Sequence, residues 1–161
     1  MATKSTAAPS PAAPGSAAMD AWVNLVVSHS RLMSALDEEL RAEHGSTMGD
    51  YDVFVQLSRA PGGRLRMCDL ASAVLLSPSG LSRRVERLER AGLVQRRRSD
   101  DDARSIEAAL TDEGKRYFRR LRKTHRAGVR ERFADRFSEE ELETLAGLLS
   151  RLTGTSEPDS C

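Results

Sequence analysis

Serine and arginine side chains are concentrated between residues 77 and 104, where their types and spacing suit contacts with an anionic polymer. Eight arginines lie between residues 83 and 104 against five acids, a local excess of three positive charges in a chain whose net charge is +1. Arginine binds phosphates and base edges through a planar fork of N–H donors, and serine adds a small donor and acceptor. Because a run of charge is more often only a solvated surface, its meaning depends on the elements that carry it.

Residues 77–92 have the pattern of one short helix with both ends marked. Ser77 is a natural N-cap, Pro78 fits the first helical position, and Gly92 stands where a helix usually ends. An apolar stripe at helical spacing is formed by Leu81, Val85 and Leu88. The opposite side carries Ser79, Arg83, Glu86 and Arg90. One face therefore packs on the protein, and the other is offered to solvent or a partner.

The outward face of this helix suits a DNA major groove. A major groove admits an α-helix, and a recognition helix reads base edges mainly from its N-terminal turns. The candidates for base contact are therefore Ser79, Ser82 and Arg83. Arg87 and Arg90 lie further along the helix and are expected to meet phosphates.

Two short strands joined by a charged turn are expected after the helix. Residues 93–97 and 106–110 have strand-like patterns, and residues 99–104 between them are polar. Leu65 is expected in a short third strand, before residues 67–74 form another helix. This is the order of elements in a winged helix-turn-helix, and it favours a nucleic-acid surface for the charge run. The expected fold class is mainly α with a small β wing.

Four segments connect this region to a known family: LRMCDLA, SPSGLSRRVERLERAGLV, DDDARS and LTDEG. Their order and spacing resemble the MarR family of bacterial transcription regulators over residues 22–152. The Asp-x-Arg wing signature, followed by a strand and Leu-Thr, is more specific than a generic helix-turn-helix. The resemblance implies a homodimeric winged-helix protein that binds double-stranded DNA. It also implies that Arg104 enters the minor groove while Asp102 holds it in place; Ser99 departs from the family, which commonly has a further acid there.

The full set of expected DNA-binding residues combines the helix, the second strand and the wing. It is Ser77, Ser79, Ser82, Arg83, Arg87, Arg90, Arg97, Arg98, Asp102 and Arg104.

The rest of the chain is expected to form outer helices and two tails. Residues 1–18 are rich in Ala, Pro and Ser and predict a disordered arm, and residues 153–161 predict a flexible tail. Residues 20–45 and 111–152 are helical in pattern, with a capping box at residues 138–141. The leucine stripe at residues 142–152 fits either intrachain core or an interface. The resemblance implies that these outer helices form a dimerisation layer around a winged unit at residues 47–110, within one MarR-like domain at residues 19–152.

The resemblance also places any small-molecule effector where the first, second and fifth helices meet the winged unit. The nearby aromatic residues are Tyr51, Phe54 and Phe118. A plain core role for them is equally open. His29, His44 and His125 have no HExxH motif or Cys/His cluster around them, so no metal or other cofactor is expected.

Composition limits the remaining function classes. There is no GxSxG motif, P-loop or Rossmann glycine pattern, so an enzyme is not expected. No apolar run is long enough to span a membrane, and two isolated cysteines favour a reduced, cytoplasmic setting. The leading hypothesis is a homodimeric repressor of inverted-repeat operators, released by a small aromatic or acidic ligand. The alternative is a winged-helix protein-interaction module without DNA readout, for which an arginine at the wing tip would have no use.

Overall fold

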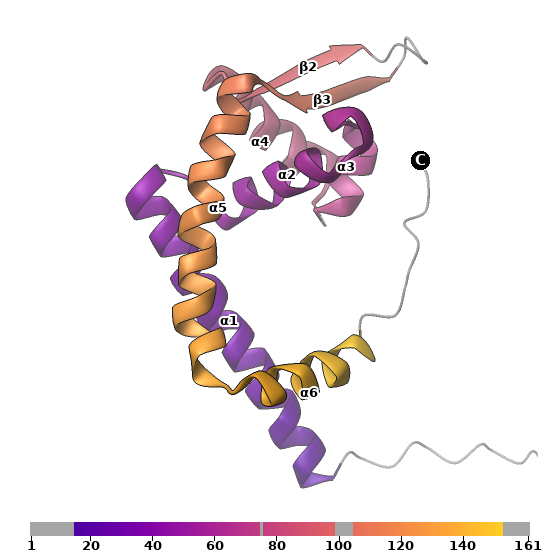
Figure 1. Ribbon diagram of the computed structural model, residues 1–161. Helices are drawn as coiled ribbons and strands as arrows, with labels where there is room; N and C mark the ends of the chain where they lie inside the picture. The colour runs from indigo at the N-terminus through magenta and orange to yellow at the C-terminus, as the bar shows by residue number, and fades with distance from the viewer. Residues whose placement is uncertain (1–14, 75, 99–104, 153–161) are drawn as a thin grey trace, which may run out of the picture.

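The computed structural model describes residues 15–74, 76–98 and 105–152, in which helices predominate (Figure 1). The elements follow in the order α1 (Ser16–His44), α2 (Met48–Arg59), β1 (Arg64–Arg66), α3 (Met67–Ala73), α4 (Pro78–Arg90), β2 (Val94–Arg98), β3 (Ile106–Leu110), α5 (Asp112–Arg132) and α6 (Glu139–Ser150). Short 3-10 turns precede β1 and α6, at Pro61–Gly63 and Ala134–Arg136. This is the mainly α fold with a small β wing that the sequence predicts.

The helices α2, α3 and α4 lie with the strands at one end of the molecule, and α1 and α5 extend away from it (Figure 1). The two long helices pack against each other, and α5 also contacts α2 and β3. Helix α6 lies at the far end, away from the strands (Figure 1). The winged unit and α6 are therefore separated by most of the length of α5.

The sheet has the strand order β1-β3-β2, and both pairs are antiparallel. In the wing hairpin Val94 pairs with Leu110 and Arg98 pairs with Ile106. Leu65 pairs with Ala108, so the predicted third strand is confirmed. This register places Val94, Ala108 and Leu110 in the core, while Arg96–Arg98 side chains remain exposed or partly exposed on β2.

One hydrophobic core joins the winged unit to α5. Its largest fully buried apolar side chains are Phe54, Leu40, Leu57, Leu70, Leu81 and Leu121. Burying one such side chain contributes about 1.5–3 kcal/mol to the stability of the folded chain. Because these residues come from five helices, the core fixes α4 against the helices behind it.

Element boundaries differ from the predicted ones by small amounts with identifiable causes. Helix α1 begins at Ser16, so residues 16–18, which composition assigned to a disordered arm, are helical. Alanine and methionine there favour helix, and the prolines that argue against it all precede Gly15. Residues 1–14 and 153–161, the rest of the expected arm and the tail, lie outside the described residues. Among the helices that are described, none is both long and apolar enough to cross a membrane.

Candidate nucleic-acid interface

The helix α4 has the ends that its sequence predicts. The Ser77 Oγ accepts a hydrogen bond from the Gly80 N–H at 3.2 Å, and Pro78 opens the helix. Gly92 follows the helix with φ 71°, a left-handed conformation that favours glycine. Leu81, Val85 and Leu88 are buried beneath the helix. The two ends and the apolar stripe together fix which side of α4 faces outward.

The outward side of α4 carries most of the predicted contact residues. Ser77, Ser79, Arg83, Arg87 and Arg90 are exposed, and Ser82 is half-buried at the edge of this face. Within the described residues nothing pairs with Arg83, whereas Arg90 lies 3.8 Å from the Glu86 carboxylate. An unpaired arginine near the N-terminal half of an exposed helix has its donors available for a base edge.

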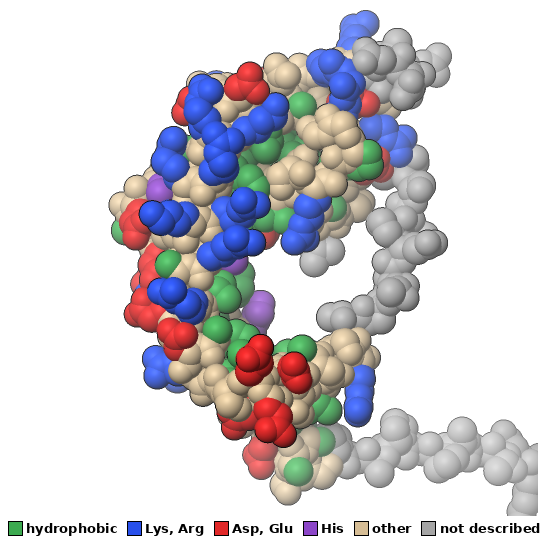
Figure 2. Space-filling view, in the orientation of Figure 1, with side chains coloured by type: hydrophobic (Ala, Val, Ile, Leu, Met, Phe, Trp, Pro, Cys, Tyr) green, Lys and Arg blue, Asp and Glu red, His purple; other side chains and the backbone are tan. Residues whose placement is uncertain are grey.

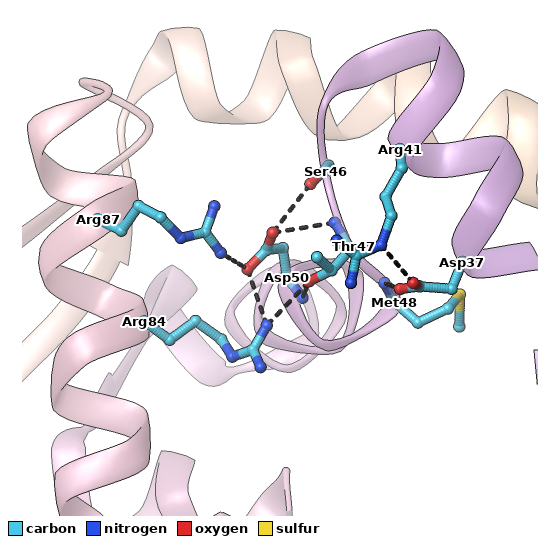
Figure 3. Close-up of polar contacts among 8 residues, drawn as sticks. All are labelled: Asp37, Arg41, Ser46, Thr47, Met48, Asp50, Arg84 and Arg87. Carbon is cyan, nitrogen blue, oxygen red and sulfur yellow. Dashed lines mark hydrogen bonds and ion pairs between the residues drawn. The ribbon is translucent and has the colours of Figure 1, made fainter. Parts of the chain in front are cut away.

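Arg87 has a partner that the sequence analysis did not anticipate. Its Nη2 donates to Asp50 Oδ1, and the Arg84 Nη1 donates to the same oxygen at 2.9 Å (Figure 3). Asp50 lies in the first turn of α2, where its other oxygen accepts from the Thr47 N–H at 3.0 Å and completes a capping box. Arg87 therefore pairs with a buried acid, although it lies on the face of α4 that is predicted to contact phosphates.

The charge of Asp50 is maintained although its side chain is fully buried. Burial alone would raise the pKa of this carboxyl, but the Thr47 N–H and the Arg87 guanidinium outweigh that effect and hold the pKa below its usual value. The neighbouring turn is fixed in a similar way, since Asp37 accepts from the Met48 N–H at 2.7 Å and from Arg41 (Figure 3). The first turn of α2 is therefore held in place behind α4 by several hydrogen bonds.

The wing strands add arginine side chains beside α4, and some of these arginines pair with acidic side chains. Arg96 donates to Glu89 of α4 at 2.8 Å, which couples the strand β2 to α4. Arg97 lies 3.8 Å from Glu107 across the hairpin, and Arg98 is exposed at the end of β2. Asp102 and Arg104, the expected wing pair, lie outside the described residues. The described part of the interface therefore consists of α4 and β2.

The predicted effector residues lie together, but in two different roles. Phe54 is fully buried and stacks on Phe118 with ring centroids 5.9 Å apart, which is a core contact. Tyr51 and Phe118 also border an open pocket of about 410 Å³ between α2 and α5. The pocket is lined by Tyr51, Val55, Ser58, Arg59, Phe118, Arg122, His125, Arg126 and Val129. Three arginines and one histidine beside two aromatic rings suit a ligand that is both flat and anionic.

Two groups of residues in these sites were missed by sequence reasoning. The pocket arginines could have been found, since Phe118, Arg122 and Arg126 recur every four residues and must share one face of a helix. Asp50 could have been found in part, because Thr47-Met48-Gly49-Asp50 has capping-box spacing. The pairing of Asp50 with α4 has no local signal. The sequence does not predict the packing partner of His125, which stacks on Tyr51 with ring centroids 4.2 Å apart.

Charged side chains also gather on helices other than α4. Lys and Arg side chains gather over α5 on the face seen in Figure 2, and Asp and Glu side chains gather over α6 below it. Within the described residues no group of three or more His, Cys, Asp or Glu side chains is placed to hold a metal ion.

Known proteins resemble this chain in both sequence and fold. Residues 44–105 match the model of the MarR family. AbsC, a MarR family transcriptional regulator from Streptomyces coelicolor, is 34% identical, with a TM-score of 0.80 over 89% of this chain and 96% of its own. Sco3205, a MarR family regulator from the same organism solved in complex with DNA, is 30% identical, with a TM-score of 0.83 over 93% and 94%. The HTH-type transcriptional repressor MdtR of Bacillus subtilis (strain 168) is 29% identical across 79% of this chain and 84% of its own.

The helix order, the three-stranded sheet and these similarities all indicate the same fold. A relative at 34% identity has the same fold over 89% of this chain. The exposed serine and arginine face of α4 lies where a winged helix-turn-helix presents its recognition helix. This chain belongs to the MarR family of transcriptional regulators.

Proposed function

We propose that the protein is a homodimeric, sequence-specific repressor that binds inverted-repeat DNA and is released by a small aromatic or acidic ligand. The observation that carries the proposal is the exposed face of α4, on which Arg83 has no partner among the described residues, beside the exposed Arg98 of β2. The similarity to a regulator solved in complex with DNA supports DNA as the partner.

The proposed dimer is supported by apolar surface on the outer helices. Trp22, Val23 and Val26 of α1 are 59%, 49% and 45% exposed, and Leu148 and Leu152 near the end of α6 are 50% and 70% exposed. No residue of α6 is buried, and Leu142, Leu145 and Leu149 of its leucine stripe are only half-buried, which favours an interface over intrachain core. An apolar patch of this kind marks an interaction surface. A second copy would cover it and would bring two α4 helices to one two-fold DNA site.

The proposed effector site is the pocket between α2 and α5. Arg59, Arg122 and Arg126 line it without an ion-pair partner among the described residues, and Tyr51 and Phe118 form aromatic walls. The burial of His125 lowers the pKa of its ring, so the anion-binding charge comes from the arginines. A carboxylate, phenolate or phosphate attached to a flat ring would satisfy both kinds of contact.

DNA binding is tested by fluorescence anisotropy on a selected duplex and on a scrambled one, at several salt concentrations. The expected result is tighter binding to the selected duplex and a linear decrease of log affinity with log salt on both. The alternative, a protein-interaction module, predicts no salt-dependent retention on DNA. The wing is tested by Arg104→Ala, which should weaken binding to both duplexes and flatten the salt slope by about one per subunit.

Effector release is tested with a panel of aromatic acids added to the protein–DNA complex. A true effector binds free protein more tightly than DNA-bound protein and so weakens DNA binding. Arg126→Gln should abolish the response, whereas Arg130→Gln, one turn further along α5 and outside the pocket lining, should preserve it. Loss of the response in both variants, or in neither, would remove the pocket from the proposal.

A further inference from the structure

Two arginines of α4 reach back toward α2 and meet at one carboxylate (Figure 3). The Asp50 side chain is 0% exposed, whereas the side chains of Arg84 and Arg87 are 25% and 48% exposed. Arg84 Nη1 also donates to Thr47 Oγ1 at 2.9 Å, so its guanidinium has two acceptors in the cap of α2. One buried group therefore joins the recognition helix to the first turn of another helix.

The contact also determines how closely α4 approaches α2. A Cβ at Gly49 would lie 2.5 Å from Arg84 Nη1 and 2.7 Å from its Cζ, so the guanidinium rests directly on the bare backbone of α2. The Nε of Arg84 is buried and has no hydrogen-bond partner within the described residues. The desolvation of buried charges offsets much of their attraction, so such a cluster is a poor source of stability alone. Its directional hydrogen bonds do restrict how α4 can rotate or slide.

We propose that Asp50 is a positioning residue for DNA reading: it fixes the orientation of α4 through Arg84 and keeps Arg87 away from phosphates. This proposal replaces the phosphate contact that the sequence analysis expects for Arg87, because the Arg87 guanidinium is paired with Asp50. This inference rests on the proposed DNA-binding function. With Asp50 in place, Arg83 is presented to bases from a fixed helix. Without its charge, α4 is less restrained, and the half-exposed Arg87 becomes available to any phosphate.

The two effects predict different changes in affinity on two kinds of DNA. Asp50→Asn removes the negative charge with little change in volume. Affinity for the selected duplex should fall about tenfold or more, the cost of losing one good base contact. Affinity for scrambled DNA should not fall, and its salt slope should steepen by about one per subunit as Arg87 gains a phosphate.

Asp37→Asn is the matched control. Asp37 also binds the first turn of α2, through the Met48 N–H, and also pairs with an arginine, but that arginine is Arg41 of α1. The control therefore loses a similar cap without touching α4. It should retain the preference for the selected duplex and the slope of the original chain. Circular dichroism and the urea midpoint of both variants show whether the fold is preserved.

Arg87→Gln, made alone and together with Asp50→Asn, completes the test as a double-mutant cycle. Alone it should leave the salt slope on scrambled DNA unchanged, and in the Asp50→Asn background it should cancel the steepening. Because Arg87 is half exposed, this single variant also decides the question if Asp50→Asn does not fold.

A slope reduced by about one in Arg87→Gln alone would show that Arg87 already contacts phosphate, and the inference would be wrong. Equal losses on both duplexes in folded Asp50→Asn, with unchanged slope, would likewise overturn it. Failure of the original chain to bind any DNA would instead refute the proposed function.

Discussion

Replacing Gly114 by Ala should separate the wing from α5 although only one methyl group is added. Gly114 is buried in the first turn of α5, and its N–H donates to the Thr111 Oγ1 cap at 2.9 Å. A Cβ at this position would lie 1.9 Å from the backbone oxygen of Leu93, the residue just before β2. That oxygen accepts the Thr111 N–H at 3.1 Å, so it cannot move away without losing the hydrogen bond.

The size of the effect on the free energy of unfolding follows from two costs and one gain. Carbon and oxygen atoms rarely approach within about 3.3 Å, so the two backbones must separate by roughly 1.4 Å. Overpacking of this kind costs about 1–3 kcal/mol, and a weakened backbone hydrogen bond adds about 1 kcal/mol. Alanine returns about 1 kcal/mol because it is the better helix former. We expect a net loss of about 2 kcal/mol in the free energy of unfolding.

Urea denaturation followed by circular dichroism measures this loss, with Gly147→Ala as control at the same protein concentration. Gly147 is exposed in α6 and its Cβ would have no atom within 4 Å, so that variant should be more stable by about 1 kcal/mol. Opposite signs in the two variants support the close contact between Leu93 and α5. A Gly114→Ala variant as stable as the original chain would show that Leu93 and α5 are not in such close contact.

Three further predictions concern α4 and the pocket between α2 and α5. Ser77→Ala removes the cap of α4 and should lower the free energy of unfolding by about 1 kcal/mol in the same urea assay; no change would show that the cap is dispensable. Arg83→Ala should cost about 1–3 kcal/mol on the selected duplex and relax the preference at one base pair in each half-site, as measured by anisotropy on single-substituted duplexes. Equal preference at all positions before and after that change would exclude a base contact. Burial lowers the pKa of His125, against the opposing charge of Asp52, so the unfolded chain takes up the proton first. Stability should be complete above about pH 6.5 and decrease as the pH falls through the lower folded pKa, and His125→Gln should reduce that decrease in the thermal midpoint.

Elements with local signals could be predicted from the sequence alone. The ends of α4 are marked within a few residues by Ser77, Pro78 and Gly92, and the strand β3 occupies the predicted residues 106–110. The capping box of α6 was predicted from Ser138 and Glu141 and is present. These features depend on hydrogen bonds between near neighbours, which spacing reveals.

Features that depend on distant pairing could not be predicted. Arg87 lies at the border between the two faces of α4, and only the approach of Asp50 from α2, 37 residues earlier, shows that its guanidinium pairs with a buried acid. The pocket between α2 and α5 likewise requires Arg59 and Arg126 to meet across two helices. Periodicity gives the face of a side chain on its own helix, but it does not identify the opposing element.

We propose that α4 reads a DNA sequence twice, once from each protomer of a dimer. Selection of bound fragments from a random duplex pool, followed by sequencing and footprinting, is the decisive experiment for this proposal. We expect enrichment of an inverted repeat whose half-sites are centred about 10 base pairs apart, with both halves protected. A pool that shows no enrichment, or that yields single half-sites bound by one protomer, would contradict it.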